Sequence, residues 1–477
     1  MNLGFKEKLS YGLGAVGKDM VYMLSASYIL YYYQDILGVS AFAMGIILMV
    51  ARVFDAFNDP IMGIVVAKTK TKWGRFRPWL LIGTLTNAAI LFLLFAAPKG
   101  LDGAGMVVYA AAFYILWGVT YTMMDIPYWS MIPAFTKGGK EREGLTTLAR
   151  SCAGVGSALI TIFTMMIVHA LGGSSKAAER DGFKWFALIV AILFIVFILI
   201  TCLNIKEKSS VEMQTAGVGQ MFKALLSNDQ AMTIVIAIVL INCSIYITSN
   251  LVIYFFKYDF GGTGWVNAYT LFNMFGGGIQ ILSMMVLYPI LRKKFTNLNI
   301  FYICLASAII GYAVLFGIAF VNMSNVFLLF IPGFFIFAAN GVLQVLTTVF
   351  LANSVDYGDL KNGRRDESVI FSMQTFVVKL ASGIAALVAS ICLTITSLTA
   401  GTEIKDGDEK IDFSLGVSDS SRLGLRMTMT IIPILGLFVA IMIFKKKFIL
   451  DEKKMAEIGE ELRERDEGSS KESSAEK

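Results

Sequence analysis

Long apolar stretches, each about 20 residues, follow one another along almost the whole chain, with polar residues gathered between them. A helix of about 20 apolar residues crosses the roughly 30 Å hydrocarbon core of a bilayer. The pattern therefore predicts an all-α membrane protein with twelve transmembrane helices, at 11–36, 41–66, 78–97, 105–128, 147–170, 185–204, 231–256, 264–290, 298–320, 325–351, 367–398 and 422–444.

Composition supports a membrane protein. Of the 477 residues, 56% are hydrophobic and only 16% are charged. The mean hydropathy of +0.68 is far above that of soluble enzymes. No nucleophile with a base, metal-ligand set or cofactor loop emerges from the chain, so we expect neither an enzyme nor a resident cofactor.

The basic residues predict the orientation in the membrane. They gather in every second loop and at both ends, as in the runs 68–77, 137–142, 292–294 and 445–447. Loops rich in Lys and Arg stay on the cytoplasmic side, so we expect a multi-pass cell-membrane protein with both termini cytoplasmic. The net charge of +6 then reflects this topology and does not indicate nucleic acid.

The longest basic connection divides the predicted spans six and six. We expect an N-terminal bundle at 1–204, a cytoplasmic middle loop at 205–230, a C-terminal bundle at 231–448 and a charged cytoplasmic tail at 449–477. Each half carries a similar charged segment after its fourth span. Two parallel six-helix halves with a site between them near the bilayer midplane form a transporter architecture.

The stretch "GLGAVGKD" at 12–19 has the glycine and lysine spacing of a phosphate-binding loop. Such a loop needs Ser or Thr after its lysine and follows a β-strand. Here Asp19 follows Lys18 inside a membrane span. The sequence therefore favours close helix packing at the glycines and a polar cavity lined by Lys18 and Asp19.

Charged side chains inside membrane spans normally face a cavity and mark functional sites. In the second span, Arg52, Asp55 and Asp59 share one helical face. Two carboxylates one turn apart repel each other unless a cation lies between them or one keeps its proton. With the amide of Asn58 nearby, this set suits Na⁺ or a proton, whereas Arg52 could equally form a structural ion pair.

The fourth span carries residue types that suit a carbohydrate. Tyr121, Asp125 and Trp129 follow one another at i, i+4 spacing, with Thr122 beside them. A carboxylate accepts sugar hydroxyl groups, and an indole stacks on the apolar face of a pyranose ring.

Two further spans add polar groups. In the eleventh span, Thr375 and Lys379 are one turn apart, with Gln374 adjacent. Arg150 begins the fifth span and is either a lipid-headgroup anchor or part of the site.

The motifs "LSYGLGAVGKD", "ARVFDAFNDPIMG", "KWGRFRPWLLIGTLTN", "YILWGVTYTMMDIPYWS", "VDYGDLKNGRRDES" and "QTFVVKLASG" resemble those of the glycoside–pentoside–hexuronide cation symporters, over roughly residues 5–450. The resemblance implies a fold of the major facilitator superfamily type and inward transport of a sugar with Na⁺, Li⁺ or H⁺ by alternating access. It also implies a cation site at Asp55 and Asp59 with Asn58, Thr122 and Lys379 nearby. The sugar would bind at Lys18, Asp19, Asp125, Trp129 and Arg150, close to Gln374 and Thr375.

One position departs from the family pattern. Where one member has a tryptophan lining the sugar cavity, this chain has Gly341, which would admit a sugar of different size or shape. The carboxylates of Asp19 and Asp125 would repel a hexuronide, so a neutral glycoside of the galactoside type is expected.

The expected partners are a small-molecule sugar, a monovalent cation and membrane lipid, with a monomer as the functional unit. A pentoside or hexuronide transporter of the same family, and a membrane protein that senses sugar or handles lipid without transport, remain the alternatives.

Overall fold

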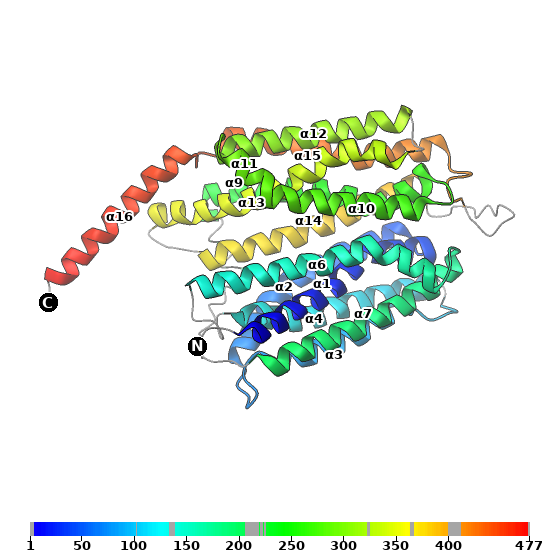
Figure 1. Cartoon of the computed structure of the whole chain (residues 1–477), viewed down its shortest axis with the longest axis horizontal. Helices are drawn as coiled ribbons and strands as arrows, with labels where there is room; N and C mark the ends of the chain where they lie inside the picture. Colours follow the sequence, from blue (N-terminus) through cyan, green and yellow to red (C-terminus); the bar gives the residue numbers. More distant parts are fainter. Residues whose placement is uncertain are drawn as a thin grey trace. The chain divides into compact units, whose positions relative to one another are not determined.

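The computed structural model describes residues 4–101, 103–132, 139–205, 219, 223, 226–321, 325–362, 367–398 and 412–475. The elements assigned over these residues are all helical (Figure 1). In chain order, with η for a short π-helical segment, they are α1 (Phe5–Tyr31), η1 (Tyr32–Ile36), α2 (Ala41–Lys68), α3 (Arg77–Phe95), α4 (Gly103–Ser130), α6 (Gly139–Leu171), α7 (Lys176–Asn204), α9 (Asp229–Tyr254), η2 (Phe255–Phe260), α10 (Trp265–Leu282), η3 (Ser283–Leu287), α11 (Tyr288–Arg292), α12 (Asn297–Val321), α13 (Val326–Asn362), α14 (Glu367–Ile395), α15 (Asp419–Lys447) and α16 (Glu452–Ala475).

The prediction of an all-α membrane fold is confirmed. Within the described residues, 11 helices are long and apolar enough to cross a membrane. The first predicted span forms α1 and η1 but is not among the 11, because Lys18, Asp19 and several small residues lower its hydropathy. With α1, the 11 helices match the twelve predicted spans in order.

The charged segment after the tenth span differs from the expected loop. Helix α13 continues through "VDYGDLKN" to Asn362, eleven residues beyond the predicted end at 351. Ser354, Val355 and Gly358 are buried within this extension. Packing of one face therefore keeps the helix intact where polar composition predicted a connection.

By contacts, the chain forms two compact units. The first comprises Met1–Thr215, Ser249–Met274 and Gly383–Arg426, and the second comprises Ala216–Thr248, Phe275–Ser382 and Met427–Lys477. The limits of these two units differ from the predicted division of the chain at 204 and 231. The limits predicted for the two six-helix bundles and the middle loop therefore remain predictions. Much of that loop, 206–218, lies outside the described residues.

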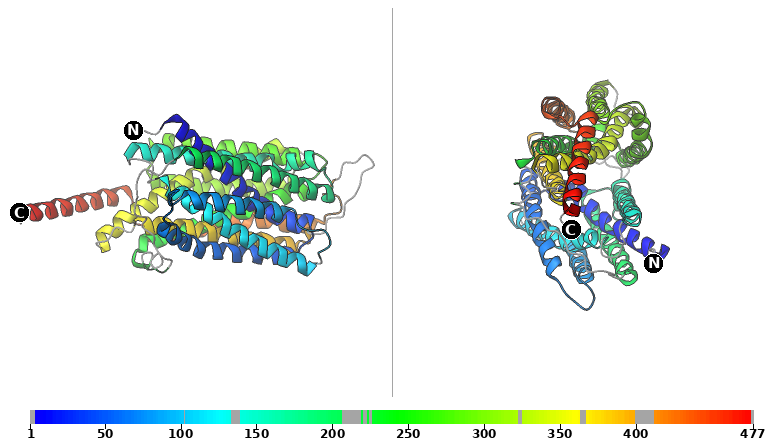
Figure 2. Two further views of the ribbon diagram at one scale, coloured as in Figure 1. Left: turned by 90° about the horizontal axis from the view of Figure 1, so that it is seen from below. Right: turned by 90° about the vertical axis from the view of Figure 1, so that its left-hand side faces the viewer.

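In the first unit, α1 packs against α6 and α7, while α4 packs against α2 and α3 (Figure 1, Figure 2). The glycines of "GLGAVGKD" lie in these contacts. A Cβ atom added to Gly14 would lie 2.5 Å from Thr201 Oγ1 on α7, and one added to Gly12 would lie 2.9 Å from Cys152 Sγ on α6. These glycines therefore allow close helix approach, as the sequence predicted.

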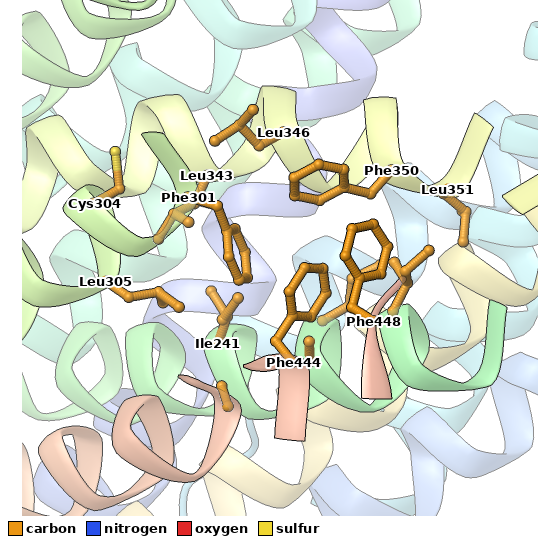
Figure 3. Packing of buried hydrophobic residues seen from close by; sticks show 14 of the residues in the cluster. Ile241, Phe301, Cys304, Leu305, Leu343, Leu346, Phe350, Leu351, Phe444 and Phe448 are labelled. Carbon is orange, nitrogen blue, oxygen red and sulfur yellow. The ribbon is translucent and has the colours of Figure 1, made fainter. Parts of the chain in front are cut away.

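The second unit has a core of aromatic and aliphatic side chains from α9, α12, α13 and α15 (Figure 3). Phe444 lies at its centre, with ring centroids 4.4 Å from Phe301 and 4.2 Å from Phe448. Phe350 on α13 lies 5.1 Å from Phe448. Offset and edge contacts at these separations add to the burial of apolar surface.

Gly341 also lies in the second unit, where α13 passes close to α10. A Cβ atom at this position would lie 2.4 Å from the carbonyl oxygen of Gln280 and 3.2 Å from Ser283 Cβ. The close packing of α13 against α10 therefore explains why position 341 is a glycine. An effect of Gly341 on the size or shape of the sugar remains a prediction.

The charged tail forms α16, which belongs to the second unit. Ile458 is fully buried in the core of that unit, and Arg465 Nη2 donates to Asp359 Oδ1 at 2.9 Å. Arg292 Nη2 lies 2.6 Å from Glu452 Oε1 at the start of the helix. Its later turns project away from α12 and α15 (Figure 1, Figure 2).

Candidate functional site

Lys18 on α1 lies between two carboxylates. Its Nζ atom is 2.8 Å from Asp125 Oδ1 on α4 and 3.3 Å from Asp19 Oδ1. The Lys18 side chain is 4% exposed, whereas those of Asp19 and Asp125 are 18% and 24% exposed. Because the lysine is buried and the carboxylates reach the surface, an entering molecule meets mainly hydrogen-bond acceptors.

Aromatic rings complete this group. The Lys18 ammonium lies 5.0 Å from the Trp129 ring centroid, and its Nζ is 3.3 Å from the hydroxyl oxygen of Tyr121. The guanidinium carbon of Arg150 lies 4.1 Å from the Trp129 ring centroid. This contact favours the interpretation of Arg150 as part of the site over that of a headgroup anchor.

Two tyrosines hold α1 against α4 beside this group. The Tyr11 hydroxyl donates to the carbonyl oxygen of Tyr128, the Tyr128 hydroxyl donates to that of Tyr11, and the two rings stack with centroids 4.4 Å apart. Both side chains are fully buried. Sequence reasoning missed this pair because two distant tyrosines leave no spacing signal.

Asp55, the first predicted cation ligand, pairs with Arg52 on the same helix. Arg52 Nη1 lies 3.3 Å from Asp55 Oδ2, and both residues are buried. Three rings surround the guanidinium carbon of Arg52, with centroids at 5.5 Å for Tyr22, 5.8 Å for Tyr114 and 6.0 Å for Trp117. The ion pair that the sequence left open for Arg52 is therefore present.

Asp59 lies one turn further along α2 and is half-buried. Its Oδ1 atom accepts a hydrogen bond from Thr122 Oγ1 on α4 at 2.9 Å. Asn58, also half-buried, precedes it. Helix α4 approaches closely here, since a Cβ atom at Gly118 would lie only 2.4 Å from Asp55 Oδ1.

The side-chain oxygen atoms at the contact between α2 and α4 determine which kind of cation could bind there. No group of three or more His, Cys, Asp and Glu side chains at metal-binding spacing occurs among the described residues. The carboxylates of Asp55 and Asp59, the hydroxyl of Thr122 and the amide of Asn58 are hard oxygen donors, which suit Na⁺, Li⁺ or a proton. That these residues bind the coupling cation remains a prediction.

The three predicted residues of the eleventh span lie on α14 in the second unit. Gln374 and Lys379 are half-buried, and Thr375 is exposed. The first unit brings together Lys18, Asp19, Tyr121, Asp125, Trp129 and Arg150, and separately Asp55, Asp59 and Thr122. A place for the α14 residues beside either group remains a prediction.

A second set of buried charges in the first unit was missed. Asp35 on η1, Glu179 on α7 and Lys257 on η2 each have a side chain that is 0% exposed. Each lies at the end of an apolar stretch, where a charge looks like an ordinary interfacial residue. The rule that identified Lys18 as a buried charge could have found them had it been applied to span ends.

Comparison with known proteins identifies the family of this chain. The family model described as "MFS/sugar transport protein" matches residues 10–449. A raffinose carrier protein of Pediococcus pentosaceus is 29% identical over 95% of this chain and 71% of its own length. An isoprimeverose transporter of Lactiplantibacillus pentosus is 29% identical over 82% of this chain and 80% of its own.

A solved structure shows the same fold. The crystal structure of a D-xylose-proton symporter superposes with a TM-score of 0.62 at 16% identity, covering 92% of this chain and 97% of that chain. The family match covers most of the chain and describes transporters, which agrees with the expectation of a non-enzyme. The chain therefore belongs to the MFS/sugar transport protein family.

Proposed function

We propose that this protein is a symporter that carries a neutral glycoside into the cell together with Na⁺, Li⁺ or H⁺. The sugar binds at Lys18, Asp19, Tyr121, Asp125, Trp129 and Arg150, and the cation binds at Asp55 and Asp59 with Asn58 and Thr122. Gln374, Thr375 and Lys379 of α14 complete the two sites when the two sequence halves of the transporter move around them.

One observation carries the coupling between the ligands. Helix α4 holds both Thr122, which donates to Asp59, and Asp125, which pairs with Lys18. Three residues of helix separate these positions, a rise of about 4.5 Å. A change at the cation residues therefore reaches the sugar residues through less than one turn of a single helix.

The cation acts first in the proposed sequence of steps. Its charge offsets the repulsion between Asp55, which pairs with Arg52, and Asp59 one turn further along the helix. Oxygen atoms of Asp59 and Thr122 then turn toward the cation, and α4 settles in the position that favours the sugar. Since coupling between two ligands is reciprocal, each ligand tightens the binding of the other.

The sugar-binding residues favour an uncharged ligand. Asp19 and Asp125 accept hydroxyl groups, Lys18 holds both carboxylates in place, and the Trp129 ring stacks on a pyranose face. The partly exposed carboxylates would repel the carboxylate of a hexuronide. A galactoside or similar glycoside meets no such repulsion.

We also propose the location, orientation and oligomeric state of the protein. It lies in the cell membrane as a monomer surrounded by lipid, with both termini in the cytoplasm, as the basic loops indicate. The sugar sensor and the lipid-handling protein are the competing interpretations to be excluded by experiment.

Uptake into sealed vesicles that contain the purified protein tests this function. Labelled neutral glycosides, pentosides and hexuronides are offered with an inward gradient of Na⁺, of Li⁺, or of H⁺ alone. We expect a neutral glycoside to accumulate above its outside concentration only when a cation gradient is present, and Lys18→Met to abolish this accumulation. Simple equilibration would indicate a facilitator, and no uptake of any sugar would indicate a sensor or lipid-handling protein.

A further inference from the structure

Lys257 lies at the centre of a buried polar network at the end of α1 opposite the N-terminus, which we call the outer end. Its Nζ atom lies 2.7 Å from Asp35 Oδ2 and 2.7 Å from the hydroxyl oxygen of Tyr31. The ring centroid of Phe413 lies 4.1 Å from the same Nζ atom. The ammonium group thus has a partner in three directions although its side chain is 0% exposed.

The network continues on both sides of Lys257. The Tyr31 hydroxyl donates to Glu179 Oε2 at 2.8 Å, and His169 Nε2 lies 2.7 Å from Glu179 Oε1. The hydroxyl of Tyr258, the residue after Lys257, donates to Asp35 Oδ1. Every charged group here has a hydrogen-bonding partner.

The two sides of this network come from different halves of the sequence. Tyr31, Asp35, His169 and Glu179 belong to α1, η1, α6 and α7, whereas Lys257 and Tyr258 belong to η2. A second contact of the same kind joins the hydroxyl groups of Tyr28 on α1 and Tyr269 on α10, 3.2 Å apart. Segments 249–274 and 383–426 accordingly belong to the same compact unit as the first-half helices.

The network lies at the outer end of α1. Tyr31, the last residue of this helix, is thirteen residues beyond Lys18, about 20 Å at 1.5 Å per residue. Tyr28 lies one turn below Tyr31. A solute that approached Lys18 from the outer end would have to pass the level of Lys257 along α1 first.

We propose that Lys257 is a positioning residue for transport that holds the outer ends of the two sequence halves together, and that its release admits sugar from outside. This inference rests on the alternating access of the proposed function. It adds an element that the sugar and cation residues do not supply: a reversible ion pair that joins the halves away from both ligands.

Loss of Lys257 affects the closed and open arrangements differently. Removing one member of a buried ion pair is strongly destabilising, because the other charge stays buried without compensation. In the closed arrangement, Lys257→Ala leaves the Asp35 carboxylate buried without its cation, whereas Glu179 keeps its bonds from Tyr31 and His169. In an open arrangement water reaches both carboxylates, so the substitution penalises only the closed state.

Neutralising both members removes that penalty. In the double variant Asp35→Asn with Lys257→Met, the closed arrangement buries an amide and an apolar side chain, and Glu179 keeps its bonds from Tyr31 and His169. The exchange of charges in Asp35→Lys with Lys257→Asp should restore closure in part. If Lys257 served stability alone, the single substitution would not increase the fraction of molecules in the open arrangement, and the double substitution would not lower that fraction again.

Cysteine accessibility measures that population. Tyr269→Cys, in a variant without the five native cysteines, places a thiol one turn below the network. Its rate of reaction with a membrane-impermeant maleimide is measured in right-side-out vesicles. Arg180→Ala is the matched control, because Arg180 donates to the carbonyl oxygens of Ala97 and Pro98, both within the first half.

Lys257→Ala should raise the reaction rate at least about tenfold, since the lost pair shifts the two-state equilibrium toward opening. The double neutral variant should return to within about twofold of the parent, and Arg180→Ala should leave the rate unchanged. An unchanged rate in Lys257→Ala, or an equally fast double neutral variant, overturns the inference. If Lys257→Ala does not insert into the membrane, Asp35→Asn replaces it in the experiment. A faster reaction rate in Asp35→Asn then supports the inference, and an unchanged rate overturns it.

The labelling experiment needs no sugar or cation, which separates this inference from the proposed function. A normal labelling response without cation-driven uptake would refute symport and leave the role of Lys257 intact. Cation-driven uptake without the labelling response would refute the role of Lys257 alone.

Discussion

Replacing Asp59 by Asn probes the cation site with little change in shape. Asp59 is half-buried, and Thr122 donates to its Oδ1 atom at 2.9 Å. A carboxylate and a monovalent cation about 4 Å apart attract each other by about 4 kcal/mol at an effective dielectric constant of about 20. Since about 1.4 kcal/mol corresponds to a factor of ten, Asp59→Asn should weaken cation binding about 10²- to 10³-fold.

The assay is sugar uptake into sealed vesicles as a function of Na⁺, Li⁺ and pH. Asp59→Asn should insert normally and transport sugar down its gradient without stimulation by any of the three cations. Thr122→Ala is the matched control, because it removes only the hydroxyl partner, a hydrogen bond to a charged group worth about 1.5–3 kcal/mol. It should keep cation stimulation at higher cation concentrations.

If Asp59→Asn kept the cation dependence of the parent, Asp59 would not bind the cation. If Thr122→Ala and Asp59→Asn had equal effects, the charge of Asp59 would contribute nothing beyond one hydrogen bond.

Two glycine substitutions test the close helix contacts. In Gly118→Ala the new methyl group would lie 2.4 Å from Asp55 Oδ1, so the carboxylate must move. The protein should still insert, but stimulation of sugar uptake should need about tenfold more cation. An unchanged cation requirement would show that the position of Asp55 is unimportant. In Gly341→Ala the methyl group would lie 2.4 Å from the Gln280 carbonyl oxygen; we expect about 1–3 kcal/mol of destabilisation, seen as a lower unfolding temperature in detergent. Gly277→Ala, where a Cβ atom meets nothing within 4 Å, should leave that temperature unchanged.

The sequence predicted the fold well because hydrophobic length is a local property. The twelve apolar stretches needed no knowledge of tertiary packing, and the helices match them in order. The charged extension of α13 was missed for the opposite reason. Its helical form depends on burial of Ser354, Val355 and Gly358, which composition does not reveal.

The sequence could predict which residue types belong to the candidate site, but not which side chains pair with one another. Lys18, Asp19 and Asp125 were expected in one cavity, and the structure adds that the lysine lies between the two carboxylates. The partner of Arg52 was left open, since Arg52 could have served either a ligand or Asp55. Spacing along a helix shows which residues share a face, whereas neighbours on other helices depend on packing.

The network around Lys257 shows the same limit more strongly. Asp35, Glu179 and Lys257 are far apart in the sequence, and each lies near the end of a span. Charges at such positions usually reach water, so these three residues were not treated as charges buried inside a span. Their burial arises where η1, α7 and η2 meet.

The central claim is that one helix, α4, couples the bound cation to the bound sugar. Calorimetry on the purified protein tests it most directly, by measuring glycoside affinity with and without Na⁺, or Li⁺, and cation affinity with and without the glycoside. We expect both affinities to rise by the same factor, about 5- to 150-fold, and this factor to fall to one in Asp59→Asn. Independent binding of sugar and cation in the parent protein would contradict it.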